Sequence, residues 1–198
     1  MMIADSAIIH PNVKLGKNVV IEDYCIIGSP FKGYDGEPTI IGDNAVIRSH
    51  TVIYAGNVIG SNFQTGNKAN IRELNTIGDD VSIGTLSIVE HHVEIGVGVR
   101  IHSQVFIPEY STLKQDAWIG PNVVFTNAKY PRSADVKKQL VGPTIGVNAK
   151  VGANSTLLPG VSVGDNALVG AGSLVAKDVP DNMTAMGHPA KAIKPVEY

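Results

Sequence analysis

The residue types best suited to chemistry are two adjacent histidines, His91 and His92, which directly follow Glu90. Two further carboxylates, Glu73 and Glu109, lie 18 residues before and 18 residues after His91. An imidazole flanked by carboxylates is held in one orientation and can take a proton from an attacking amine or hydroxyl. A general base of this kind typically accelerates a reaction by about 10²–10⁴. We therefore interpret this segment as a candidate general-base site.

The elements that would position these side chains follow from a repeat of six residues. Apolar residues recur at every sixth position in three runs, residues 3–27, 41–125 and 145–175, and Thr65 is the one polar residue in this register. A period of six excludes an amphipathic helix, whose apolar stripe repeats every 3.6 residues, and favours short strands joined by Gly, Asn and Asp turns. Three strands close one coil of 18 residues, and coils stack by parallel pairing at about 4.8 Å. The sequence predicts an all-β, single-stranded parallel β-helix of about nine coils.

The repeat is interrupted twice. Residues 28–40 and residues 126–144 contain the extra residues, and both interruptions follow the same corner of the coil. Two independent loops are therefore expected to leave the prism at one edge. We predict one β-helix over residues 1–180 that carries both loops, and a C-terminal tail, residues 181–198, that packs on it.

Stacking of the coils places residues 18 positions apart directly above one another. Glu73, His91, Glu109 and Asn127 should thus form one column at intervals of about 4.8 Å, with His92 one step to the side. The corner that carries this column is the one from which both loops leave. This coincidence favours a functional site over a merely solvated ridge.

The composition of the chain limits the partners and the compartment that we expect for it. The chain has 198 residues, 43% apolar and 17% charged, and a formal net charge of −2, so it offers no electrostatic basis for binding nucleic acid or an anionic membrane. The single cysteine, Cys25, fits a reducing compartment. No stretch resembles a signal peptide or a membrane span, and we expect a cytoplasmic protein.

The C-terminal third carries the most specific resemblance. Its segments PGVSVGDN (159–166), VGAGSLVAKDVP (169–180) and GHPAK (187–191) resemble the signature of the acyl-CoA-dependent transferases of the left-handed β-helix superfamily, the hexapeptide-repeat acyltransferases. The resemblance implies left-handed coiling, a homotrimer, and acetyl-CoA in a groove between subunits. Small residues let the pantetheine arm lie on the backbone, and lysines suit phosphates. By this match the coenzyme-binding candidates are Trp118, Ala153, Ala171, Lys177 and Lys191.

Two other segments are similar to sugar-modifying members. Residues 123–132 (VVFTNAKYPR) resemble a loop of the nucleotide-linked amino-sugar N-acetyltransferases. Residues 88–96 (IVEHHVEIG) are similar to a segment, VEHD..IG, of sialic-acid-type and bacillosamine-type sugar N-acetyltransferases, in which the histidine acts as base. That match selects His91. His92 stands in place of the acidic residue, however, and related enzymes hold their histidine one place later, so the choice between the two stays open.

One residue departs from a neighbouring subfamily. Galactoside and maltose acetyltransferases have a catalytic histidine just before the proline of the 123–132 loop, where this chain has Tyr130. The guanidinium of Arg132 is suited to bind a phosphate or carboxylate through two parallel hydrogen bonds. The side chains expected to bind the acceptor are Glu73, Glu90, Glu109, Tyr110, Tyr130 and Arg132.

The leading hypothesis is acetyl transfer from acetyl-CoA to the amine of a nucleotide-linked amino sugar at a subunit interface. His91 or His92 would take the amine proton, and Asn127 or backbone N–H groups would stabilise the oxyanion. O-acetylation of a sugar or another small acceptor is the alternative among enzymes, and a non-catalytic scaffold is the alternative outside them. The sequence names neither the sugar, the nucleotide nor the position acetylated, and it does not settle the oligomeric state.

A metal enzyme of the same fold is disfavoured. The γ-type carbonic anhydrases hold a metal through three histidines and use a His-x4-His spacing within one chain. The spacing from His91 or His92 to His102 does not fit that pattern. We therefore expect no metal requirement.

Overall fold

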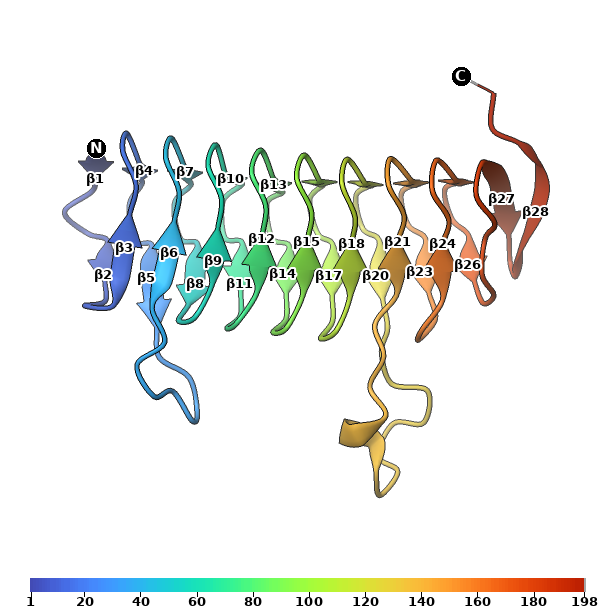
Figure 1. Cartoon of the computed structure of the whole chain (residues 1–198), viewed down its shortest axis with the longest axis horizontal. Helices are drawn as coiled ribbons and strands as arrows, with labels where there is room; N and C mark the ends of the chain where they lie inside the picture. The colour runs from blue at the N-terminus through green and yellow to red at the C-terminus, as the bar shows by residue number, and fades with distance from the viewer. Residues whose placement is uncertain (198) are drawn as a thin grey trace.

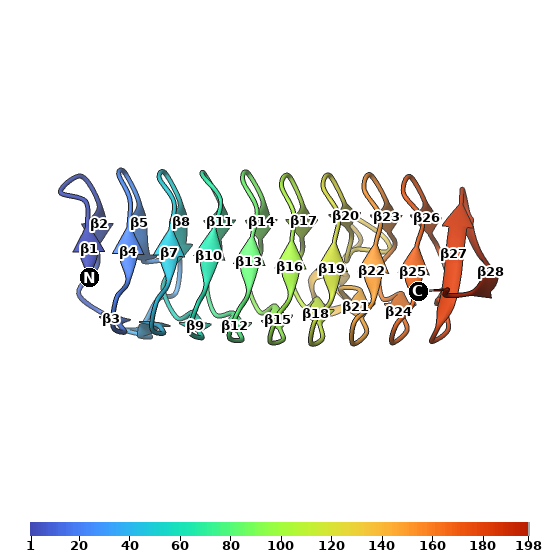
Figure 2. The same ribbon diagram turned by 90° about the horizontal axis from the view of Figure 1, so that it is seen from above.

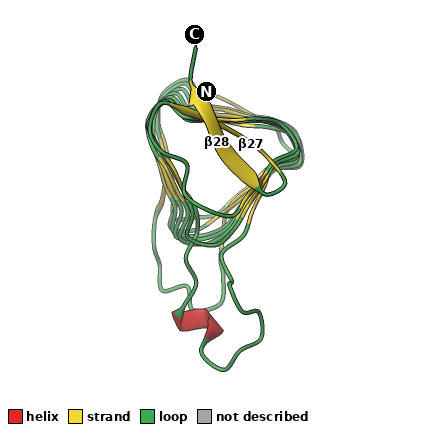
Figure 3. Cartoon of the chain, turned by 90° about the vertical axis from the view of Figure 1, so that its right-hand side faces the viewer, coloured by secondary structure: helices red, strands yellow, loops and turns green. Residues whose placement is uncertain are grey.

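The chain forms a three-sided prism of stacked coils (Figures 1 and 3). The computed structural model describes residues 1–197. Up to β26, each side of the prism is one parallel sheet, in which a strand pairs with the strand three places further along the chain, one coil away. The all-β, parallel, stacked-coil fold is thus confirmed, and its left-handed sense stays a prediction.

The three sheets are named A, B and C in chain order. Sheet A contains β1 (Met2–Ile3), β4 (Val20–Ile21), β7 (Val46–Ile47), β10 (Gln64–Thr65), β13 (Ser82–Ile83), β16 (Arg100–Ile101), β19 (Trp118–Ile119), β22 (Lys150–Val151), β25 (Leu168–Val169), β27 (Met183–Gly187) and β28 (Ala190–Pro195). Sheet B contains β2 (Ile8–Ile9), β5 (Ile26–Ser29), β8 (Val52–Tyr54), β11 (Asn70–Ile71), β14 (Ile88–Val89), β17 (Phe106–Ile107), β20 (Val124–Phe125), β23 (Thr156–Leu157) and β26 (Leu174–Val175). Sheet C contains β3 (Val13–Leu15), β6 (Thr39–Ile41), β9 (Val58–Ile59), β12 (Thr76–Ile77), β15 (Glu94–Ile95), β18 (Thr112–Leu113), β21 (Thr144–Ile145) and β24 (Ser162–Val163).

Most strands are short because the chain turns a corner soon after each inward-pointing aliphatic side chain. The inward residues form one continuous buried core along the prism. Thr65, the polar residue in the register, is buried too, with its hydroxyl 3.3 Å from that of Thr51. Phe63, two residues earlier, is fully buried and supplies volume that Thr65 lacks.

Close stacking requires glycine at some turns. A Cβ added at Gly42 would lie 2.6 Å from the backbone of Gly60, one coil away. Turns elsewhere place a residue in the left-handed region, such as Asn44 with φ 59° and Asn62 with φ 59°. Asn tolerates this conformation better than most residues, which explains the many Asn residues in the turns.

Both loops leave the prism where sheet B passes to sheet C, which we call the B–C edge. One connects β5 to β6, and the other, which contains the 3-10 turn η1 (Val136–Lys138), connects β20 to β21. They project on the same side of the molecule, opposite sheet A (Figures 1 and 3). Seen from above, sheet A faces the viewer (Figure 2).

The last strands close one end of the prism. β27 continues sheet A by parallel pairing with β25, and β28 returns antiparallel along β27. Among residues 1–197, no helix is long and apolar enough to cross a membrane.

Candidate active site

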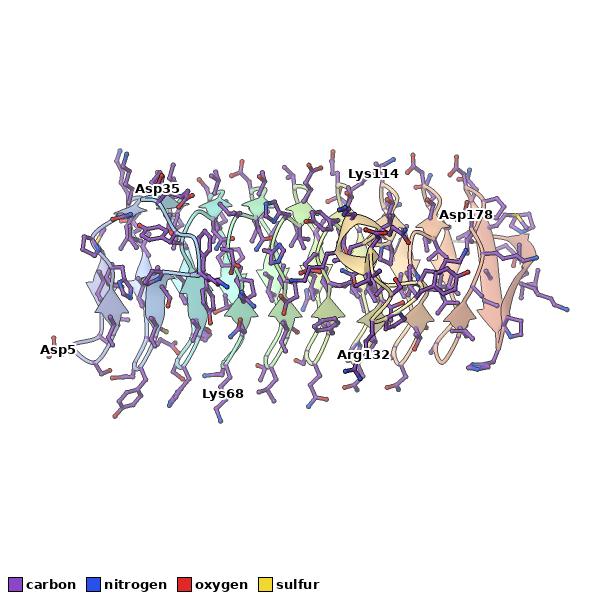
Figure 4. The ribbon with its side chains drawn as sticks, turned by 90° about the horizontal axis from the view of Figure 1, so that it is seen from below. Asp5, Asp35, Lys68, Lys114, Arg132 and Asp178 are labelled. Carbon is purple, nitrogen blue, oxygen red and sulfur yellow. The ribbon has the colours of Figure 1, made fainter. Side chains whose placement is uncertain are left out.

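His91 and His92 lie in the turn after β14, on the B–C edge. β14 pairs in register with β11 on one side and with β17 on the other, so the turns that follow these three strands are vertical neighbours. The histidines therefore lie on the stretch of the edge between the two loops. Figure 4 looks onto this edge, with Asp35 and Arg132 labelled on the loops.

Three residues of the predicted column, His91, Glu109 and Asn127, are linked by hydrogen bonds between side chains. Nε2 of His91 lies 2.8 Å from Oε1 of Glu109. Nδ2 of Asn127 donates to Oε2 of the same carboxylate at 2.9 Å and to the backbone carbonyl of Glu109 at 3.3 Å. Both carboxylate oxygens are thus engaged, and Asn127 holds the carboxylate in place against His91.

The two histidines contact each other directly. Nδ1 of His91 lies 2.7 Å from Nδ1 of His92, with the rings nearly perpendicular at 82°. The ring of Tyr110 lies beside His92, with centroids 5.7 Å apart. His91 thus uses both ring nitrogens, whereas Nε2 of the exposed His92 has no hydrogen-bond partner within the described chain.

His92 adopts the left-handed backbone conformation that recurs in the turns of the prism. Its φ is 55°, in the left-handed region, and Tyr110 one coil away has φ 62°. The equivalent residues in plain turns include Asn44 and Asp80. Other turns place quite different side chains in the same conformation, including Lys68 with φ 58° and Leu74 with φ 60°, so the backbone alone does not select His92 for a role.

Of the two carboxylates that lie one coil away from His91, only Glu109 contacts its ring. Glu73 is buried, at 7% exposure, and receives two hydrogen bonds from the Arg72 guanidinium, at 2.8 and 2.9 Å. The same guanidinium reaches Glu90 at 3.5 Å and lies 4.9 Å from the ring centre of Tyr54. Arg72 captures Glu73 because the two are chain neighbours, and only Glu109 forms an ion-pair contact with His91.

The Arg72–Glu73 pair is firmly ionised. Burial opposes the charge of Glu73, but the hydrogen bonds and positive charge of Arg72 outweigh it and hold the pKa of Glu73 below its usual value. The hydrogen bond to Glu73 likewise raises the pKa of Arg72. With neutral histidines, Glu73, Glu90, Glu109 and Arg72 leave this part of the edge net negative.

Two buried asparagines that sequence reasoning missed shape these turns. Nδ2 of Asn57 and Nδ2 of Asn75 each donate to the backbone carbonyl of Arg72, at 2.8 Å. Oδ1 of Asn75 accepts from the backbone N–H of Val93, the residue after His92, at 2.7 Å. The available signal was Asn at an inward position where the repeat expects a small residue.

The remaining acceptor-binding candidates lie around this column or on the second loop. Tyr110 contacts both histidine rings, at 6.2 Å from His91 and 5.7 Å from His92. Tyr130 and Arg132 are exposed on the loop between β20 and β21, where the ammonium of Lys129 lies 5.5 Å from the ring centre of Tyr130.

The coenzyme candidates from sequence are mostly on another edge. The side chain of Trp118 lies on sheet A, with its ring 4.6 Å from that of His102, and Ala153 and Ala171 follow β22 and β25 where sheet A passes to sheet B. Burial, followed by the charge of Arg100, lowers the pKa of His102, which favours its neutral form.

Short side chains are a steric need at this A–B edge. A Cβ on Gly120 would lie 2.7 Å from the amide nitrogen of Ala153, and one on Gly152 would lie 2.5 Å from that of Ala171. Neither glycine can therefore carry a side chain without moving the backbone of the next coil. Lys177, on the B–C edge after β26, and Lys191, in β28, are both exposed.

No group of three or more His, Cys, Asp or Glu side chains within residues 1–197 is arranged to hold a metal ion.

Comparisons with known proteins agree with this architecture. Residues 142–177 match the family described as bacterial transferase hexapeptide (six repeats). The chain is 31% identical over 180 residues to the bifunctional protein GlmU of Listeria monocytogenes serotype 4a, an alignment that covers 91% of this chain and 36% of that protein. It is 32% identical over 184 residues to the GlmU of Alkaliphilus oremlandii, covering 93% and 37%. The chain thus spans little more than a third of the length of these relatives.

Among solved structures, the chain resembles LpxA, a UDP-N-acetylglucosamine acyltransferase from Bacteroides fragilis, with a TM-score of 0.64. The alignment covers 98% of this chain and 74% of that one at 20% identity. LpxA from Acinetobacter baumannii gives a TM-score of 0.58 at 20% identity, covering 98% and 72%. At this level of identity the likeness concerns the fold.

Proposed function

The chain belongs to the superfamily of hexapeptide-repeat acyltransferases, and we propose that it transfers an acetyl group from acetyl-CoA to the amine of a nucleotide-linked amino sugar. The observation that carries this proposal is the bonded set Asn127–Glu109–His91–His92, which lies on the edge from which both loops leave. An oriented imidazole with a free nitrogen is suited to take the proton of an attacking nucleophile. The name of the Bacteroides fragilis protein associates this fold with acyl transfer to a nucleotide sugar.

The charge around the histidines supports an amine acceptor over a hydroxyl. The three carboxylates of Glu73, Glu90 and Glu109 outnumber the one guanidinium of Arg72 here, so a cationic group is attracted to the site. An amino sugar arrives largely as the ammonium form, and it must release one proton to solvent before its nitrogen can attack; the histidine base then takes the second proton during the attack. A hydroxyl acceptor gains nothing from the negative surroundings.

The reaction needs one base. As the neutral amine nitrogen bonds to the thioester carbonyl carbon, the histidine base takes a proton from that nitrogen. The C–S bond then breaks, and the same imidazolium returns the proton to the departing thiolate, which leaves as the thiol. Backbone N–H groups would stabilise the intermediate oxyanion. Asn127 would join them only by turning from Glu109, so its predicted oxyanion role stays a prediction.

The acceptor class is tested by measuring thiol release from acetyl-CoA with a panel of nucleotide amino sugars and their hydroxyl counterparts. We expect release with at least one amine and at least about 10²-fold less with the matching hydroxyl compound, because only the amine exploits both the base and the local charge. Release with hydroxyl acceptors alone would assign O-acetylation. Absence of CoA binding in isothermal titration, together with no release for any acceptor, would favour the scaffold hypothesis.

The chain is further proposed to act as a homotrimer with the base near a subunit interface. The outer face of sheet B is unusually apolar for a sheet exposed to water, with Ile8 54%, Ile88 38% and Val124 39% exposed. In one chain, Trp118 lies on sheet A, and Ala153 and Ala171 lie on the A–B edge, away from the histidines on the B–C edge, so a site that contains both sets requires a second copy. Sedimentation should give three times 20.9 kDa. A monomeric mass for the active enzyme would refute this assembly.

A further inference from the structure

The geometry points to Nε2 of His92 as the atom that accepts the proton, with His91 as a positioning residue that links His92 to Glu109. This inference rests on the proposed acetyl transfer. The sequence leaves the choice between the two histidines open. The hydrogen bonds of His91 and His92 decide it, because each one fixes where the next proton lies.

The chain of reasoning starts at Glu109. An ionised carboxylate can only accept hydrogen bonds, so Nε2 of His91, at 2.8 Å from Oε1, must carry a hydrogen and donate it. A neutral imidazole has one N–H, which leaves Nδ1 of His91 as an acceptor. Asn127, with its amide nitrogen on the second carboxylate oxygen, keeps Glu109 in this position.

The second histidine then has its proton position set in turn. Nδ1 of His92 lies 2.7 Å from the accepting Nδ1 of His91, so the hydrogen between them belongs to His92. The other nitrogen of His92, Nε2, therefore carries a lone pair. That nitrogen has no hydrogen-bond partner among residues 1–197 and belongs to an exposed side chain on the B–C edge.

The arrangement also suits the protonated state. When Nε2 of His92 takes a proton, the imidazolium still donates from Nδ1 to His91, and the negative charge of Glu109 lies beyond it. Tyr110, with its ring tilted 34° to that of His92, limits rotation of the side chain. His91, whose two nitrogens are both occupied, would have to break one of these bonds to act as the base itself.

The proton positions can be read without any assay of activity. In protein labelled with ¹⁵N-histidine, long-range ¹H–¹⁵N spectra distinguish protonated from unprotonated ring nitrogens, and the variants His91→Gln and His92→Gln assign the signals. We expect, near neutral pH, His91 protonated on Nε2 and His92 protonated on Nδ1. A neutral His92 with its hydrogen on Nε2 would overturn the inference, even if acetyl transfer is confirmed.

Steady-state kinetics of two variants provide a second test of which histidine is the base. In His91→Gln, the new side chain can donate from its amide nitrogen to Glu109 and accept from His92 through its amide oxygen. This variant should therefore keep kcat within about tenfold of the wild-type value, a much smaller loss than the removal of a general base causes. His92→Gln, which removes the proton acceptor, should lower kcat by about 10²–10⁴. The reverse order would make His91 the base. If the wild-type protein transfers no acetyl group to any acceptor, the proposed function fails, whereas the spectra still decide the proton positions.

Discussion

The variant His92→Asn is expected to lose about 10²–10⁴ in kcat while it unfolds at the same or a higher temperature than the wild-type chain. The loss follows because an amide cannot take a proton from the attacking amine. The gain in stability follows because residue 92 has φ 55°, a region that Asn occupies at lower cost than most residues. Thermal unfolding and steady-state kinetics on the same preparation measure both effects.

A matched control is available in His50→Asn. His50 has φ 62°, is exposed, and lies at the A–B edge against Tyr24, so it undergoes the same chemical change in the same backbone conformation away from the histidine pair. This control should keep kcat. An active, stable His92→Asn protein would exclude His92 as the base. If the variant is inactive, its unfolding temperature shows that the lost activity does not come from lost structure.

The variant Glu109→Gln should be comparably damaging, although it changes one oxygen to one nitrogen. Nδ2 of Asn127 is a donor whose orientation is fixed by its second bond, to the Glu109 backbone carbonyl at 3.3 Å. The amide oxygen of the substituted side chain must therefore face Asn127, which turns its NH₂ group toward His91. Nε2 of His91 then becomes an acceptor, its hydrogen moves to Nδ1, and His92 is left with its hydrogen on Nε2.

This reversal leaves no lone pair where the base is needed, and we expect kcat to fall by about 10²–10⁴ with little change in unfolding temperature. The ¹⁵N signals of both histidines should exchange their protonation patterns. Glu94→Gln, an equivalent change on the exposed outer face of sheet C, serves as the control. Full activity of Glu109→Gln would mean that the carboxylate does not govern the proton positions.

The six-residue period was sufficient to predict the stacked coils, because the core of such a prism requires an inward-pointing aliphatic side chain at each corner. The spacing of 18 residues likewise predicted that His91, Glu109 and Asn127 would be neighbours, and their contacts are seen. Both follow from backbone register alone, which a regular repeat fully specifies.

Contacts that depend on side-chain orientation were not predictable in this way. Glu73 has the same register relation to His91 as Glu109 has, yet it pairs with Arg72, because an adjacent guanidinium competes for it. The contact between His91 and His92 depends on the left-handed turn at residue 92, which the repeat does not report. The roles of Asn57 and Asn75 similarly require knowledge of which carbonyls the turns leave unpaired.

The most direct test is a structure of the chain with CoA and an amino-sugar acceptor bound, in which one distance decides. The acceptor nitrogen should lie about 2.6–3.2 Å from Nε2 of His92, with Glu109 and His91 still in contact. An acceptor nitrogen placed against a nitrogen of His91, or bound away from the B–C edge altogether, would contradict the account.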